Sequence, residues 1–234
     1  EHRRDILLTR RSVPAYVAAT LPPVNLGKVD NSGYEVQLNW NQPINDLRYT
    51  VGINFLFARN KIIFNDEPLS NYEYQWETGR PIGQNFGYEF IGFFKDQKDI
   101  DNSPLYYEGT KPGDVKYKDI NGDGVINSAD ITAIGYPQYP EITFGLNGEI
   151  YYKNFDLTFL LQGAANVSIA LSDEFIIPYL NDGPVMKYIW NERWTPETAE
   201  TATYPRLIAS PTRDHNNYMP SSLWTKDASY LRLK

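Results

Sequence analysis

Residues 142–164 carry the pattern that most limits what this chain can fold into. Apolar side chains occupy alternate positions on both sides of the dipeptide Lys153-Asn154: Ile142, Phe144, Leu146, Ile150 and Tyr152 before it, and Phe155, Leu157, Phe159 and Leu161 after it. A period of two on both sides of a polar two-residue turn predicts an antiparallel hairpin. Each arm has about ten residues, which is the length of a tilted strand that crosses a bilayer.

Residues 34–58 repeat this pattern. Tyr34 to Asn41 and Leu47 to Ala58 both alternate, and a short turn that contains Pro43 separates them. Proline ends the first strand because it has no N–H for the ladder. Two hairpins with one wholly apolar face indicate an outer-membrane barrel, with lipid outside and water inside. A soluble sandwich with one wet face stays open as the alternative.

The same reasoning along the whole chain predicts an all-β, antiparallel barrel segment. The expected strands lie near 34–41, 47–58, 72–79, 87–94, 142–152, 155–164 and 224–234. The expected long loops are 59–71, 95–140 and 166–222, and they alternate with short turns. Short turns at one end and long loops at the other are typical of outer-membrane barrels, whose long loops are extracellular. About seven strands cannot enclose a channel, so such a chain would be part of a larger barrel.

Composition excludes several other classes. The net charge of −7 and the lack of a long basic block argue against nucleic acid as a partner. The sequence has no Cys, and therefore no disulfide framework and no thiol nucleophile. No run approaches the roughly 18 apolar residues of a transmembrane helix. Residues 1–5 do not resemble a signal peptide, so we expect targeting information upstream of this chain.

A twelve-residue segment, 119–130, matches the calcium loop of EF-hand type. Calcium prefers oxygen ligands, and glycine at the sixth position allows the sharp turn. The candidate ligands are the side chains of Asp119, Asn121, Asp123, Asn127 and Asp130 and the backbone carbonyl of Val125. We expect a structural ion that stiffens a long loop, because no entering helix precedes it. The alternative is a loop whose Asn and Asp side chains only satisfy backbone groups.

Several segments together resemble SusC/RagA-type TonB-dependent outer-membrane transporters. They are 24–35, 113–124, 134–135, 193–197, 204–207 and, most tellingly, Ala228-Ser229-Tyr230-Leu231-Arg232-Leu233. The resemblance extends over almost the whole chain. It implies a 22-stranded barrel with an N-terminal plug domain. This chain would be an internal part of the barrel's C-terminal half, and the plug domain is absent from it.

The resemblance also implies a function. Members of this family import glycans or peptides across the outer membrane of Bacteroidetes-type cells, with energy supplied through TonB. A SusD-like surface lipoprotein caps the extracellular mouth. Under this hypothesis the apolar face contacts outer-membrane lipid, and the long loops shape the substrate or lid surface. Aromatic residues of 166–222 are candidate contacts for substrate or partner, although ordinary loop packing is the alternative for each: Tyr179, Tyr188, Trp190 and Trp194.

Two other functions stay open at the level of sequence. A soluble carbohydrate-binding or adhesion module stiffened by calcium is the second hypothesis, although its single calcium loop argues against a dockerin. An enzyme is third, because His2 and His215 lie in polar, turn-like surroundings and no Gly-x-Ser-x-Gly elbow is present. We therefore expect no catalytic residues.

Overall fold

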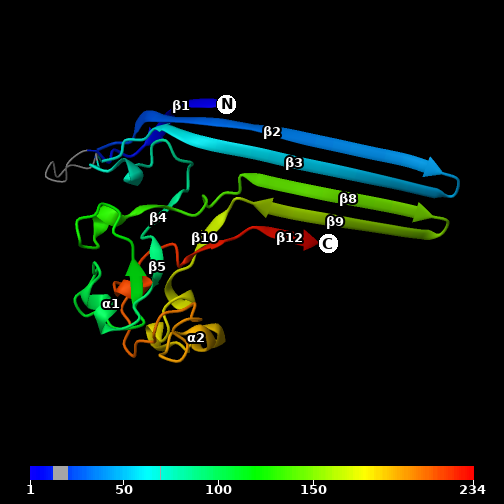
Figure 1. Cartoon of the computed structure of the whole chain (residues 1–234). Coiled ribbons are helices and arrows are strands. Elements are labelled where there is room, and N and C mark those ends of the chain that lie inside the picture. The colour runs from blue at the N-terminus through cyan, green and yellow to red at the C-terminus, as the bar shows by residue number, and fades with distance from the viewer. Residues whose placement is uncertain (13–20, 69) are drawn as a thin grey trace. The chain divides into compact units, whose positions relative to one another are not determined.

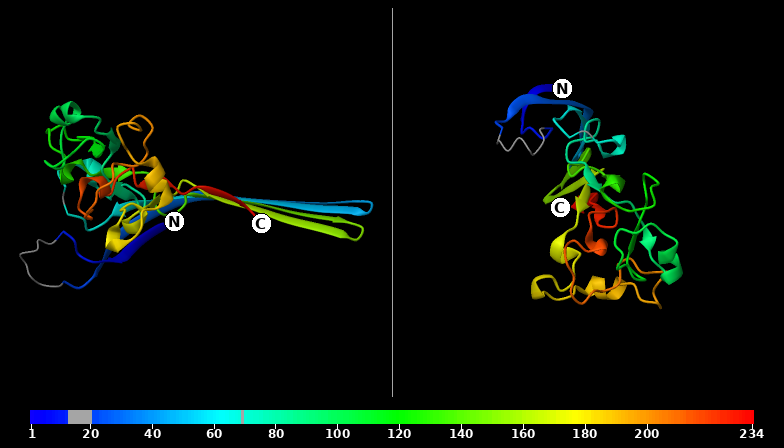
Figure 2. Two further views of the ribbon diagram at one scale, coloured as in Figure 1. Left: turned by 90° about the horizontal axis from the view of Figure 1, so that it is seen from below. Right: turned by 90° about the vertical axis from the view of Figure 1, so that its left-hand side faces the viewer.

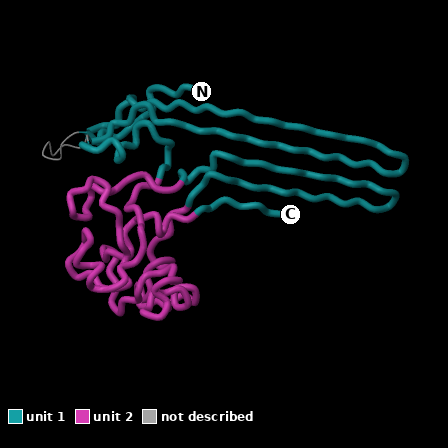
Figure 3. The backbone as a smooth tube through the Cα atoms, in the orientation of Figure 1, with its two compact units in different colours: residues 1–84, 136–168, 227–234 teal, residues 85–135, 169–226 magenta. Residues whose placement is uncertain are grey.

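The structure is a computed structural model that describes residues 1–12, 21–68 and 70–234. Residue 69, which belongs to the expected loop 59–71, and residues 13–20 lie outside this description. The chain divides into two compact units (Figure 3). Unit 1 comprises residues 1–84, 136–168 and 227–234, and unit 2 comprises residues 85–135 and 169–226.

Unit 1 is built on one antiparallel six-stranded sheet (Figure 1). Its strands, in spatial order, are β1 (His2–Leu8), β2 (Val24–Ile44), β3 (Leu47–Phe64), β8 (Ile142–Tyr152), β9 (Phe155–Ala165) and β12 (Tyr230–Leu233). The four central strands are paired along their length, and their two hairpins extend in the same direction in the left view of Figure 2. Tight turns at Asn45-Asp46 and Lys153-Asn154 join them in pairs, and Asn45 and Lys153 adopt positive φ angles of 54° and 52°.

The sheet order corrects the predicted number of barrel strands. β3 pairs directly with β8, so residues 65–141 form one long excursion between two neighbouring strands. The strand expected near 72–79 was wrong: this segment contains the short 3-10 turn η2 (Glu73–Gln75). Local bonds hold it, because the Arg80 guanidinium donates to the carbonyls of Trp76 and Tyr74 at 3.1 and 3.0 Å. Side-chain bonds to nearby backbone groups compete with strand ladders in this way.

Unit 2 consists of short strands, short helices and 3-10 turns packed around its own core. The segment expected as one strand near 87–94 is divided into β4 (Asn85–Gly87) and β5 (Phe90–Phe93), which pair with β7 (Thr132–Ile134) and β6 (Val115–Tyr117). β10 (Ser168–Ala170) pairs with β11 (Thr225–Asp227). The helices and remaining 3-10 turns are α1 (Gln97–Asp101), η3 (Ser128–Asp130), η4 (Asp173–Phe175), η5 (Leu180–Asp182), α2 (Lys187–Glu192) and η6 (Asn216–Tyr218).

A buried polar network ties the two chain segments of unit 2 together. The Asp114 side chain is fully buried and accepts hydrogen bonds from Asn217 and from the backbone N–H of Lys111 at 2.9 and 2.8 Å. Arg206 lies 2.7 Å from the same carboxylate as an ion pair. The Asn217 side-chain oxygen Oδ1 in turn accepts from Val115 N–H at 2.8 Å. The segments expected as long loops, 95–140 and 166–222, thus contain short strands, helices and 3-10 turns, including α2 at the place where Asp182 and Pro184 signal the start of a helix.

No helix among the described residues has the length and apolar character needed to cross a membrane.

Candidate functional site: a two-faced sheet and its loops

The strand register brings the apolar positions of four strands onto one face of the sheet. In one row, Leu38 pairs with Ile53, Ile53 with Leu146, and Leu146 with Leu161. In the neighbouring row, Val36 pairs with Phe55, Phe55 with Phe144, and Phe144 with Gly163. Side chains of directly paired residues point to the same face, so an apolar pattern in each strand becomes one continuous apolar surface.

This apolar face is open to its surroundings. Trp40 and Leu157, which both lie on this face, are 61 % and 59 % exposed. Two phenylalanine rings on the face lie across glycines of the paired strand: Phe159 over Gly148 and Phe144 over Gly163. A soluble monomer rarely exposes an apolar surface that extends over several strands, and such a surface marks a contact with protein or membrane.

The opposite face carries two rows of uncharged amides. Gln37, Asn54 and Gln162 belong to one row, and Asn39 and Asn147 belong to the next. Gly52 and Gly145 lie between them. The Asn147 Oδ1 atom is 2.4 Å from the place that a Cβ of Gly52 would occupy, and the Asn54 Oδ1 atom is 2.3 Å from that of Gly145, so these two amides lie close against the glycine backbone. Within the described part of the chain, the five amides make no side-chain hydrogen bond to one another or to other residues.

A buried carboxylate marks the end of the sheet where the long excursions begin. Glu141 has a side chain that is only 5 % exposed, and it accepts two hydrogen bonds of 2.7 Å from Arg59 and one of 3.1 Å from Asn166. Arg59 belongs to β3, whereas Glu141 immediately precedes β8. The hydrogen bonds from Arg59 and, to a smaller extent, from Asn166 hold the pKa of Glu141 below its usual range, although burial opposes them.

The calcium-type segment 119–130 forms a compact loop in unit 2. Asp119 accepts one backbone N–H on each carboxylate oxygen, from Gly122 at 2.7 Å and from Gly124 at 2.8 Å. Asp130 is fully buried, and its carboxylate accepts from Ile120 and Asn127 N–H groups, which closes the two ends of the loop. Gly122 and Gly124 have φ angles of 75° and 84°, which favour glycine.

The remaining predicted ligands belong to the same loop. Asp123 accepts from Val125 N–H at 2.9 Å and from the Asn121 side chain at 2.8 Å, and these bonds lower the pKa of Asp123. The Asn127 side chain accepts from Ala129 N–H at 2.7 Å. The described residues contain no group of three or more His, Asp and Glu side chains gathered around one metal position. The hydrogen bonds of the loop are thus those expected for the alternative, in which the Asn and Asp side chains bind backbone N–H groups. Calcium binding stays a prediction.

The donor set nevertheless fits a hard cation. Every candidate ligand atom is oxygen, as calcium prefers. A carboxylate offers about four lone-pair sites, and Asp119 and Asp123 each use two of them for hydrogen bonds. Gly122 to Val125 are exposed, so an ion can reach the loop from solvent.

The four predicted aromatic contacts have different surroundings in unit 2. Trp190 is 50 % exposed, and the Arg193 guanidinium lies 3.8 Å from its ring centroid. Tyr179 and Tyr188 are 41 % and 40 % exposed, and the Tyr188 hydroxyl donates to the carbonyl of Phe175. Trp194 packs on Gly113, where an added Cβ would lie 2.4 Å from the indole. Their role in binding stays a prediction.

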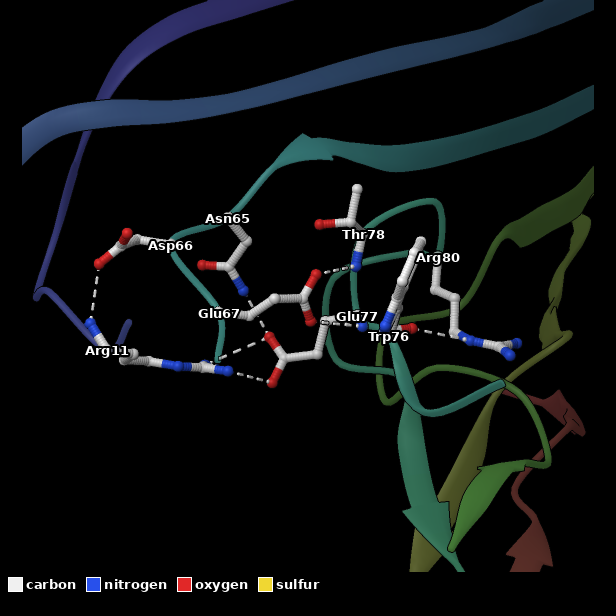
Figure 4. Close-up of polar contacts among 8 residues, drawn as sticks. All are labelled: Arg11, Asn65, Asp66, Glu67, Trp76, Glu77, Thr78 and Arg80. Carbon is white, nitrogen blue, oxygen red and sulfur yellow. Dashed lines mark hydrogen bonds and ion pairs between the residues drawn. The ribbon is translucent and has the colours of Figure 1, made fainter. Parts of the chain in front are cut away.

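A feature missed by the sequence reasoning lies in the excursion after β3. A polar network joins Arg11 with loop 65–80 (Figure 4). The Arg11 guanidinium donates to Glu77 at 2.8 and 3.3 Å, and Asp66 accepts from the Arg11 N–H at 2.8 Å. No motif signals this arrangement, because its members are separated by up to 66 positions in the sequence.

The chain is similar in sequence to several TonB-dependent receptors. No protein-family model matches the chain. A TonB-dependent receptor, P26, of Formosa agariphila is 28 % identical over 97 % of this chain, and a second, P3, from the same organism is 27 % identical over 99 %. TonB-dependent receptor SusC of Bacteroides thetaiotaomicron is 29 % identical over 61 % of the chain. The resemblance to SusC/RagA-type TonB-dependent receptors is confirmed. All three relatives are named receptors, in agreement with the expectation that the chain is not an enzyme.

Solved structures agree on the fold of these SusC/RagA-type proteins. The RagAB peptide transporter matches the whole chain with a TM-score of 0.70 and 20 % identity. The RagAB peptide importer in its closed-closed state matches with a TM-score of 0.66 and 21 % identity. The predicted fold class, an antiparallel segment of this barrel fold, is confirmed, and the six-stranded sheet of this chain does not close by itself. The chain spans about a quarter of the length of the two Formosa relatives.

Proposed function

We propose that this chain forms part of the barrel wall of an outer-membrane TonB-dependent transporter. The observation that carries the proposal is the continuous register of β2, β3, β8 and β9, which separates an apolar face from an amide face. The apolar face contacts lipid, and the amide face lines the aqueous interior. The long excursions lie at one end of the strands, as extracellular loops do, and the tight turns lie at the other end.

The energetics favour this orientation of the two faces. An amide without a hydrogen-bond partner costs several kcal/mol in hydrocarbon, so five such amides must face water. The opposite surface gains about 25 cal/mol for each Å² of apolar area that leaves water. A single sheet with these two faces is therefore stable at a boundary between lipid and water. The SusC and RagAB similarities support the same assignment.

The transported substrate is a glycan or a peptide in this proposal. The protein cooperates with a SusD-like lipoprotein, and its energy comes from TonB through parts of the full-length protein outside this chain. The names of the relatives support TonB dependence, and a peptide importer is among the structural neighbours. The proposed location is the outer membrane, as for SusC/RagA-type proteins in general.

We further propose that the loop 119–130 holds a structural calcium ion. Asp119, Asn121 and Asp123 would supply side-chain oxygens and Val125 its carbonyl, and Asn127 and Asp130 would complete the set. Bound calcium would supply positive charge that offsets the carboxylates of the loop. The ion would stiffen a segment that otherwise depends on hydrogen bonds to its own backbone.

Fractionation of native cells tests the proposed function. An antibody against residues 166–222 should detect a large, heat-modifiable band in the outer-membrane fraction, with a lipoprotein that co-purifies. Deletion of the gene should abolish growth on the transported nutrient and leave growth on glucose intact. A band near 27 kDa in the soluble fraction would overturn the proposal and favour the calcium-stiffened β-module.

A further inference from the structure

A hollow of about 330 Å³ lies in unit 1, where β3 ends and the long excursion begins. Its walls are formed by Ser12, Phe64, Asn65, Asp66, Glu67, Pro68, Trp76 and Thr78. The volume is at the lower end of the range for small-ligand sites. It is large enough for one long side chain and too small for a whole oligomer.

The apolar walls of the hollow are held in place before any ligand arrives. The Trp76 indole N–H donates to the Ser70 carbonyl at 3.1 Å, which fixes the plane of the ring. Glu67 accepts the backbone N–H groups of Glu77 and Thr78 at 2.8 and 3.0 Å, so the chain on both sides is anchored (Figure 4). A preorganised wall loses little entropy when a ligand binds.

The charged groups that line the hollow all have the same sign. Among the described residues that line it, Asp66 and Glu67 are the two ionisable side chains, and none is cationic. Hydrogen bonds, chiefly from the Ser12 side chain, lower the pKa of Asp66. Burial is the largest single influence on Glu67 and raises its pKa, but hydrogen bonds from Thr78 and Glu77 together outweigh burial, so the pKa of Glu67 is lowered as well. Both groups are therefore ionised at neutral pH. Glu67 uses one acceptor position on each oxygen, so it retains lone pairs for a further donor.

One carboxylate beside the hollow already binds a guanidinium group of the chain itself. Arg11 pairs with Glu77 beside the hollow, with its guanidinium nitrogens 2.8 and 3.3 Å from the carboxylate oxygens (Figure 4). The Asn65 amide donates to the same carboxylate at 2.5 Å. Glu77 is thereby paired with a cation, whereas Asp66 and Glu67 form no ion pair with the described residues, although the charges of Arg10 and Arg11 act on them from a greater distance.

We propose that this hollow binds a basic side chain of a peptide, with its methylene groups against Trp76 and Phe64 and its charged end at Asp66 and Glu67. Lysine and arginine combine an apolar stem with a charged head, which matches apolar walls below an acidic rim. The face of the Trp76 ring adds a cation–π attraction for the charged end. Carboxylates repel sulfate, phosphate and carboxylate groups, so acidic ligands are disfavoured. The proposal deepens the proposed uptake function and rests on it for the arrival of peptides at this loop.

Binding to the purified full-length protein in detergent tests the proposal. The probes are two blocked tripeptides, acetyl-Gly-Lys-Gly-amide and the same peptide with norleucine, which keeps the methylenes but lacks the charge. Calorimetry should show at least about tenfold tighter binding of the lysine peptide, which corresponds to about 1.4 kcal/mol. The difference should shrink as salt rises from 50 to 300 mM, because the ion contact is partly exposed.

Three variants locate the site. Trp76→Leu and Glu67→Gln should each weaken the lysine peptide at least about fivefold, and Glu73→Gln should leave the affinity unchanged. Glu73 is the matched control because it belongs to the same loop and does not line the hollow. If Glu67→Gln unfolds the loop, the comparison of the two peptides on the unaltered protein still decides the matter.

Three results would overturn the proposal. They are equal affinity for the two peptides, no binding of either peptide, and binding of neutral maltotriose that is lost in Trp76→Leu, which would make the hollow a sugar subsite. Each of these leaves the proposed uptake function standing if the protein fractionates with the outer membrane. A soluble protein in the fractionation experiment would instead remove the uptake function, whatever the peptides do.

Discussion

Arg59 and Glu141, which are 82 positions apart, form a two-pronged ion pair in which both hydrogen bonds measure 2.7 Å. The pair joins the outer part of β3 to the residue that precedes β8. It therefore holds together the two ends of the excursion 65–141 just beyond the last paired residues of β3 and β8, Phe57 and Ile142. Asn166, just after β9, donates to the same carboxylate and includes a third strand in the contact.

Replacement of Glu141 by glutamine should destabilise the protein. Glutamine keeps the size of the side chain but loses the charge and one of the two acceptor oxygens. We expect a loss of about 1–2 kcal/mol, less than for a fully buried pair because Arg59 is half exposed. The temperature at which the heat-modifiable band shifts on a gel would measure this loss of stability. Glu35→Gln, which also removes one carboxylate from unit 1, is the matched control, and equal melting of the two variants would contradict the assigned role.

The same pair predicts a dependence of stability on pH. The pKa of Glu141 is lowered in the folded protein, chiefly by Arg59, so its contribution is fully present above the unfolded pKa of about 4.3. That contribution is lost as the pH falls through the lower, folded pKa. The melting temperature of the unaltered protein should therefore drop more steeply below pH 4.5 than that of Glu141→Gln. Parallel curves for the two proteins would show that Glu141 carries no such linkage.

Two glycines on the apolar face should differ in their tolerance of alanine. At Gly148 the three heavy atoms nearest to an added Cβ all belong to the Phe159 ring, the closest at 2.3 Å. At Gly163 it would meet the Phe144 ring at 2.3 Å and also the Tyr230 carbonyl oxygen at 2.7 Å, which belongs to the neighbouring backbone. Overpacking costs about 1–3 kcal/mol, and backbone yields less than a side chain. We expect Gly163→Ala to be the more destabilising of the two.

Double variants test this explanation. Phe159→Leu should relieve most of the penalty of Gly148→Ala, because it removes the atoms that clash. Phe144→Leu should relieve only part of the penalty of Gly163→Ala, since the Tyr230 carbonyl remains. Melting of the single and double variants gives the coupling in each pair. Full relief in both pairs would show that the Tyr230 backbone does not limit the site.

The long hairpins could be predicted from sequence because their signal is local. Period-two alternation in residues 34–58 and 142–164 fixes both the strand type and the face of each side chain. The pairing of β3 with β8 could not be predicted, because 77 residues separate the two strands and no local pattern records which strands meet. The weak alternation at Tyr72, Tyr74 and Trp76 was misleading for the same reason. Local hydrogen bonds to Arg80 decide that segment.

The features of the candidate site could likewise be predicted only where their residues are close together in the sequence. The loop 119–130 could be predicted because all its polar groups lie within twelve positions, and because its glycines occur where the backbone has positive φ angles. The hollow beside Trp76 and the Arg59–Glu141 pair could not, since their members come from distant segments. The barrel and its orientation in the membrane were expected from the family resemblance, because no single hairpin determines them.

Neighbouring residues 53 and 54 offer a direct test of the two faces. Ile53 lies on the apolar face and Asn54 on the amide face, one position away in β3. Ile53→Lys places a charge in lipid and should cost about 2–4 kcal/mol near the middle of the bilayer. Asn54→Lys should cost much less, because its side chain faces water. Assembly into the outer membrane, measured as heat-modifiable protein in that fraction, should fall for Ile53→Lys alone. Equal loss for both variants would contradict the assigned faces.

Calcium should stabilise the protein through the loop 119–130. After chelation, addition of calcium at 100 times its dissociation constant should add about 2.7 kcal/mol to the free energy of unfolding if the ion binds only the folded state. Asp119→Ala should abolish this gain. The variant also loses the hydrogen bonds to Gly122 and Gly124, so the measurement is the difference between melting with and without calcium for each protein. Asp214→Asn, an exposed aspartate outside the loop, should retain the full gain. If calorimetry detects no heat and the unaltered protein gains no melting temperature, the loop depends on its hydrogen bonds alone.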